Sequence, residues 1–218
     1  MMHDSAIATA ADYADAMLTA RRAKNALVLL TLLILLIQIA LFFTARYTNV
    51  IFHDATAATL PAATQPTTDW RDMLKYVIGA SNFLGVIFPV LLGFVLLLIV
   101  KIMLVGRLIG VARTTSAYIW CLLLIALLFP WQAFLSNVTF TSTDFKIPGV
   151  LYTWEELTNA TVGARFSSGV TPESILKWAR YVGWPLVAVI LLLIIQVKSN
   201  RGLRQAFGED ATVETLNP

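Results

Sequence analysis

Four long apolar segments constrain the fold of this chain more than any other feature of its sequence. They are segments 26–44, 83–105, 117–135 and 181–197. A helix needs about 20 such residues, with a range of roughly 17–25, to cross the hydrocarbon core of a bilayer. The chain is 58% hydrophobic and 13% charged, whereas soluble domains are about 45–50% apolar and about 25% charged. We therefore expect an all-α integral membrane protein with four transmembrane helices.

The positions of lysine and arginine predict that both termini lie in the cytoplasm. With this orientation, nine cytoplasmic bases lie close to the ends of spans: Arg21, Arg22, Lys24, Lys101, Arg107, Arg113, Lys198, Arg201 and Arg204. The exported bases are instead spread through two long loops. Because bases near span ends set the orientation, we expect both termini to be cytoplasmic, with these bases acting as membrane anchors. The only cysteine, Cys121, lies inside the third span, so the exported loops hold no disulfide, which favours a bacterial inner (plasma) membrane.

The four spans divide the rest of the chain into cytoplasmic and exported parts. The cytoplasmic parts are an N-terminal helix or tail at 1–25, a connector at 106–116 and a tail at 198–218. The exported parts are loops at 45–82 and 136–180, each expected to end in a short interfacial amphipathic helix, at about 69–80 and about 172–180. The segment before the second of these helices is expected to form a small cap, with a short strand at Val138, Phe140 and Phe145.

Two patterns carry the prediction of interfacial helices. After Asp69, a capping residue, apolar side chains recur on one helical face: Trp70, Met73, Leu74, Val77 and Ile78. In the second loop, Thr171 is followed by Pro172 at the first helical position. Because each half of the chain thus reads as span, loop, surface helix and span, an internal parallel repeat is an alternative that the sequence leaves open.

The sequence contains no arrangement of residues that indicates a catalytic, cofactor or metal site. No ionisable residue occurs in the core of a predicted span, which argues against proton-coupled pumps and voltage sensors. The two histidines, His3 and His53, fall on opposite sides of the membrane, so they cannot hold a haem together. We see no zinc-ligand spacing and no nucleophile motif. The sequence therefore predicts no catalytic, cofactor or metal site, and the scattered bases predict no nucleic-acid partner.

Five residues inside the spans are candidates for helix packing or a kink: Gly85, Pro89, Gly93, Gln38 and Gln196. The two glycines and the proline are spaced by four and share one face of the second span, where small residues allow close helix approach and proline permits a kink. This face is interpreted as a packing seam, and the alternative is a flexible pore-lining helix. The two glutamines are expected to hydrogen-bond across helices.

Aromatic residues at the ends of spans and in the exported loops suggest contact surfaces. The candidates are Trp70, Trp131, Trp154, Trp178 and Trp184. Such residues anchor protein interfaces and also line the bilayer interface. The leading hypothesis is a non-enzymatic accessory, scaffolding or assembly subunit that contacts the lipid bilayer and other membrane protein subunits, or associates with itself. The alternative is a small oligomeric transporter or channel lined by the kinked second span.

Overall fold

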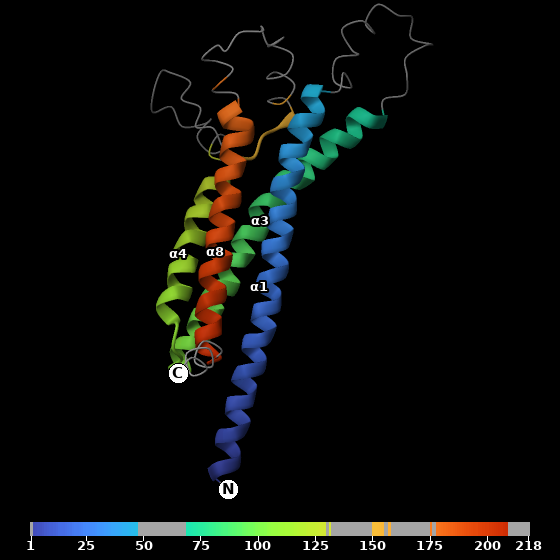
Figure 1. The fold of residues 1–218 in the computed structure, drawn as a ribbon. Helices are drawn as coiled ribbons and strands as arrows, with labels where there is room; N and C mark the ends of the chain where they lie inside the picture. Colours follow the sequence, from blue (N-terminus) through green and yellow to red (C-terminus); the bar gives the residue numbers. More distant parts are fainter. Residues whose placement is uncertain are drawn as a thin grey trace, which may run out of the picture. The chain divides into compact units, whose positions relative to one another are not determined.

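The computed structural model describes four long helices and one short π-helical turn (Figure 1). They are α1 (Met2–Tyr47), α3 (Asp69–Val105), α4 (Val111–Leu128), η3 (Ala179–Gly183) and α8 (Trp184–Ala206). The structure describes residues 2–47, 69–129, 131, 150–154, 157, 175 and 178–208, with side chains from residue 12 to 44 in α1 and from residue 73 in α3. These residues contain no strand, and each of the four helices is long and apolar enough to cross a membrane. The prediction of an all-helical chain with four such helices is confirmed.

The helices are longer than the apolar segments. Helix α1 has 46 residues, which at about 1.5 Å per residue is over twice the roughly 30 Å thickness of a hydrocarbon core. Helix α3 runs without a break through the segments predicted as an interfacial helix and the second span, and α4 begins six residues before the predicted third span. Hydropathy marks only the stretch that suits a bilayer, whereas alanine-rich or mixed sequence continues the helix beyond it. The predicted strand at Val138, Phe140 and Phe145 lies outside the described residues.

The chain divides into two compact units. Unit 1 consists of residues 1–32, 87–126 and 189–218, and unit 2 consists of residues 33–86 and 127–188. All four long helices contribute residues to both units.

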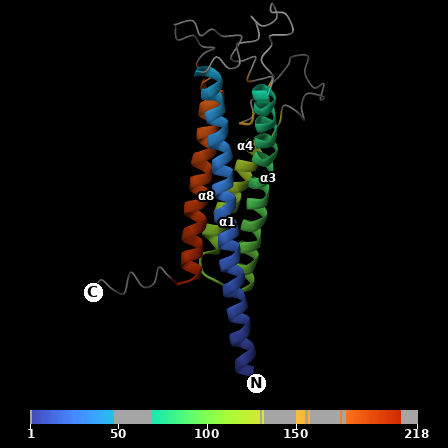
Figure 2. The ribbon, with the colours of Figure 1, turned by 90° about the vertical axis from the view of Figure 1, so that its right-hand side faces the viewer.

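Unit 1 has a core of buried apolar side chains from three helices. Met17 and Ala20 of α1 pack with Ile99 and Met103 of α3 and with Leu203 of α8. The side chains of residues 12–16 of α1 are exposed, and Figures 1 and 2 both show this end of α1 continuing beyond the other helices of the unit. Among the side chains that the structure describes in α1, the first to pack within unit 1 is therefore Met17.

The start of α4 lies very close to α8 in unit 1. Gly110 has a φ of +97°, and its carbonyl accepts hydrogen bonds from the backbone N–H groups of Arg113 and Thr114, both at 3.2 Å. A Cβ added to Gly110 would lie 2.5 Å from the carbonyl oxygen of Gly202, and a Cβ added to Gly202 would lie 2.3 Å from Thr114 Oγ1. Both glycines are therefore needed for this approach.

Unit 2 has an aromatic core that includes part of the segment between α4 and η3. Phe42 and Tyr181 stack with ring centroids 4.9 Å apart, and Tyr152 packs edge-on against Tyr181 at 5.2 Å. Ile78 and Leu157 are buried in the same cluster. Residues 150–154 and 157, called the strap below, thus pack against the helices of their own unit.

Candidate functional site

Helix α1 carries three buried polar side chains at intervals of seven residues. Lys24 and Gln38 are 0% exposed and Thr31 is 1% exposed. A seven-residue interval returns to nearly the same face of a helix, so these residues share the buried seam of α1. Thr31 donates to the carbonyl of Leu27 in its own helix, at 2.8 Å. Lys24 and Gln38 need partners from other elements, because a buried polar group without a hydrogen bond costs free energy.

In unit 2, Gln38 joins α1 to α3 through two hydrogen bonds. Its Nε2 atom donates to Ser81 Oγ at 2.6 Å and to Asn82 Oδ1 at 3.0 Å. Ser81 in turn donates to the carbonyl of Ile78. We call Gln38, Ser81 and Asn82 the amide cluster. Because both donors of one amide are used, the cluster fixes the register of α1 against α3.

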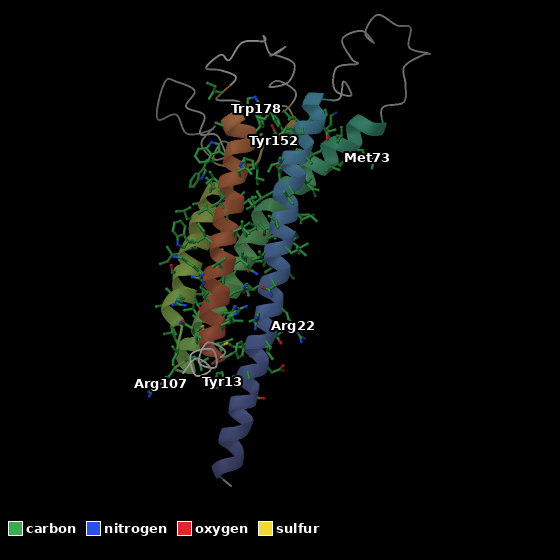
Figure 3. The ribbon with its side chains drawn as sticks, in the orientation of Figure 1. Tyr13, Arg22, Met73, Arg107, Tyr152 and Trp178 are labelled. Atoms are coloured by element: carbon green, nitrogen blue, oxygen red, sulfur yellow. The ribbon has the colours of Figure 1, made fainter. Side chains whose placement is uncertain are left out.

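The strap adds to this cluster through Tyr152. The carbonyl of Tyr152 accepts from Asn82 Nδ2 at 2.9 Å, and its hydroxyl donates to the carbonyl of Gln38. Burial, with a further contribution from Tyr181, raises the pKa of the Tyr152 hydroxyl, although a backbone hydrogen bond from Phe42 opposes the shift. The hydroxyl therefore stays protonated and remains a donor. Figure 3 labels Tyr152, which belongs to the strap, beside α1.

In unit 1, Lys24 is buried against α8. Its ammonium donates to Asn200 Oδ1, and one turn away on α8 Gln196 Nε2 donates to Asn25 Oδ1 at 3.1 Å. Among the side chains that the structure describes, no carboxylate pairs with Lys24. Lys24 was expected, with the other bases near span ends, to act as a membrane anchor, but its side chain is 0% exposed because α1 packs on α8.

The pairing of Lys24 with an amide gives an asymmetric prediction for substitutions. We expect Lys24→Met to leave the melting temperature unchanged or to raise it, because methionine fills a similar volume without burying a charge. Asn200→Leu should lower the free energy of unfolding by about 2 kcal/mol, because it leaves the ammonium without an acceptor. Thermal unfolding of both purified variants in one detergent measures the difference. Equal losses for the two variants would contradict this account of the pair.

The structure brings other residues close to Gly85, Pro89 and Gly93 of α3. In unit 2, a Cβ added to Gly85 would lie 3.1 Å from Leu151 Cδ2. In unit 1, a Cβ added to Gly93 would lie 3.2 Å from Ile125 Cδ1, and the carbonyl of Pro89 lies 3.7 Å from Cys121 Sγ. The face that carries these three residues is therefore in contact with apolar side chains at each position.

The candidate aromatic residues lie in different surroundings. Trp154 and Trp178 are half-buried and pack on the aromatic core of unit 2, where Trp178 meets Phe42 edge-on at 5.9 Å. Trp131 is 39% exposed and Trp184 is 37% exposed. Trp70 lies in α3, but its side chain is outside the described residues.

Sequence reasoning missed the polar partners that matter most in this arrangement. Lys24, Thr31 and Gln38 could have been linked through their seven-residue spacing, which matches the buried apolar positions Leu35 and Phe42 of the same helix. Tyr152 had no such signal, because it lies in a segment without helical periodicity. Its contacts come from an element far away in the sequence.

The amide cluster holds α1 to α3 by hydrogen bonds. The bonds from Lys24 to Asn200 and from Gln196 to Asn25 hold α1 to α8. In the part of the chain that the structure describes, no three His, Cys, Asp or Glu side chains gather where they could hold a metal ion. Comparison of the chain with models of protein families, with curated proteins and with solved structures finds no match. We therefore infer function from the geometry of the chain itself.

Proposed function

We propose that this chain is a non-enzymatic accessory, scaffolding or assembly subunit of a complex in a cell inner membrane, with its exported loops, which include the strap, as the recognition surface. The strap carries the proposal. Tyr152 and Leu157 are buried on the helices of unit 2, and two hydrogen bonds hold Tyr152 to α1 and α3. Because burial and hydrogen bonds already hold the strap in place, its residues have less conformational freedom to lose on binding, which favours protein contact.

The alternative of an oligomeric transporter or channel lined by the second span has less support. A pore-lining face needs polar groups and space, whereas Leu151 and Ile125 contact the positions of Gly85 and Gly93. The amide of Gln38 is bonded to α3 and is enclosed within unit 2. These contacts suit helix packing better than a path for a solute.

Membrane orientation and interfacial helices form part of the same proposal. Helix α3 has 37 residues, about 56 Å of helix, so a substantial part of it exceeds the roughly 30 Å hydrocarbon core. Near its start, Met73 is 60% exposed and Tyr76 is 78% exposed, as suits a segment in the headgroup region. The bases near span ends favour cytoplasmic termini.

Native mass spectrometry of the full chain, extracted gently from its own membrane, tests the subunit proposal. We expect one larger complex of fixed stoichiometry. Trp154→Ala should lower the yield of this complex at least tenfold, because an aromatic interface residue commonly contributes about 2 kcal/mol or more. Ile190→Ala is the matched control, since this α8 side chain is 55% exposed and lies away from the strap in the sequence.

Two results would count against the proposal. A protein that stays monomeric and without a partner after several mild extractions would remove the subunit function. Solute flux through vesicles that contain only the purified chain would favour the transporter instead. Trp154→Ala must keep the melting temperature of the wild type within a few degrees for its result to be used.

A further inference from the structure

The turn between α3 and α4 has an arginine in a backbone conformation that normally takes glycine. Arg107 has a φ of +49°. Its N–H donates to the carbonyl of Leu104 at 3.2 Å, and the N–H of Leu108 donates to the carbonyl of Met103 at 2.9 Å. These two bonds form a Schellman motif, in which the left-handed position directly after the helix is usually glycine. The residue before it, Gly106, is a glycine, but the left-handed position is occupied by Arg107.

The arginine side chain is therefore present despite a backbone cost. A non-glycine residue in this region costs of order 1 kcal/mol or more. The Arg107 side chain is exposed and points away from the helices (Figure 3). It makes no hydrogen bond or ion pair with the residues that the structure describes. Nothing within the described chain therefore offsets the cost, and the guanidinium is accessible to a ligand.

The surroundings of Arg107 combine exposed apolar and exposed basic side chains. Val105 is 69% exposed and Ile109 is 76% exposed, and Lys101 and Arg113 are exposed on either side of the turn. The apolar exposure continues from the span itself, where Leu98 of α3 is 53% exposed. A surface of this kind suits the boundary between acyl chains and headgroups.

The excess of basic side chains in unit 1 favours an anionic lipid headgroup. Among the described side chains of unit 1 the only acids are Asp12 and Asp15, which lie on α1, whereas basic residues occur on all of its helices. Guanidinium groups bind phosphate oxygens through paired hydrogen bonds. We propose that the turn from Leu104 to Arg113 binds the headgroup of an anionic phospholipid, with Arg107 and Arg113 on the phosphate and with Val105 and Ile109 among the acyl chains.

Replacement of Arg107 by glycine distinguishes a role of this side chain in lipid binding from a role in stabilising the fold. The full chain is purified in mild detergent with an equal mixture of phosphatidylglycerol and phosphatidylcholine, and native mass spectrometry gives the ratio of the two lipids retained. The wild type should prefer phosphatidylglycerol. Arg107→Gly should lower this preference about fivefold, since each base near an anionic surface contributes about 1 kcal/mol. Its melting temperature should stay equal or rise, because glycine adopts a positive φ without strain.

Three controls make the result decisive. Arg107→Lys keeps the charge and should retain most of the preference. Arg22→Gln removes the same charge from an exposed position on α1, which Figure 3 shows apart from Arg107, and should leave the lipid ratio unchanged. Excess inorganic phosphate should not displace phosphatidylglycerol, because the acyl chains contribute to binding.

The proposal is overturned if Arg107→Gly leaves the lipid ratio unchanged or lowers the melting temperature. It is also overturned if Arg22→Gln lowers the preference as much as Arg107→Gly, which would indicate a general charge effect. Displacement of the lipid by inorganic phosphate would show that the turn binds a free anion instead. None of these outcomes depends on whether the chain has a protein partner.

Discussion

Gly202→Leu is expected to lower the free energy of unfolding by about 3 kcal/mol or more, because the side chain has no space in a packed interior. Even a Cβ at this position would lie 2.3 Å from Thr114 Oγ1 and 3.2 Å from the backbone nitrogen of Thr114. The start of α4 would have to move away from α8. Thermal unfolding of the purified variant in detergent measures the loss.

A second pair of variants tests whether this contact is the cause. Gly202→Ala alone should be destabilising, and Thr114→Ala in the same chain should recover part of the loss by removing the hydroxyl that meets the new Cβ. Gly79→Ala is the matched control in α3, because a Cβ there would have no neighbour within 4 Å. It should be neutral or slightly stabilising. Additive losses at Gly202 and Thr114 would rule out the proposed clash.

Tyr152→Ala is expected to release the strap from unit 2 and to lower the free energy of unfolding by about 3–5 kcal/mol, the usual cost of removing a large buried aromatic side chain. The ring is 2% exposed and packs against Tyr181. Without the ring, the backbone of residue 152 is held less firmly, which weakens the hydrogen bond from Asn82 Nδ2 to its carbonyl. Thermal unfolding gives the overall loss, and faster protease cleavage within the strap gives the local one.

A second variant divides the loss of unfolding free energy in Tyr152→Ala between the ring and the hydroxyl. Tyr152→Phe keeps the ring and should cost only about 1 kcal/mol, the net value of one hydrogen bond. Tyr76→Ala is the control, since this side chain is 78% exposed and surface changes commonly stay within about 0.5 kcal/mol. If Tyr152→Ala were as stable as the control, the strap would contribute nothing to unit 2.

The number of spans could be read from the sequence because long apolar runs have few alternatives to crossing a bilayer. The extent of the helices could not. Residues before Ala26 in α1 and between Asp69 and Asn82 in α3 are polar enough to be assigned to separate elements, yet backbone hydrogen bonding continues through them. Hydropathy reports the solvent that a residue prefers, and it does not report where a helix ends.

The candidate site was only partly accessible to the same reasoning. Gln38 was recognised as a polar residue in a span, but its partners Ser81 and Asn82 lie 43 and 44 residues away. Tyr152 lies 114 residues from the Gln38 carbonyl that it bonds. The burial of Lys24 and the meeting of Gly110 with Gly202 likewise follow from tertiary packing. Spacing along one segment carries no information about such distant partners.

The hydrogen bond between Lys24 and Asn200 can form only late in the synthesis of the protein. Its two residues are separated by 176 positions, and ribosomes add about 5–20 residues per second. The first hydrophobic helix therefore waits about 9–35 seconds before its ammonium can meet the acceptor on the last one. During that interval the nascent chain must keep Lys24 hydrated at the membrane surface or shielded by the insertion machinery. The packing of Lys24 against α8 is thus completed only after α8 has been synthesised.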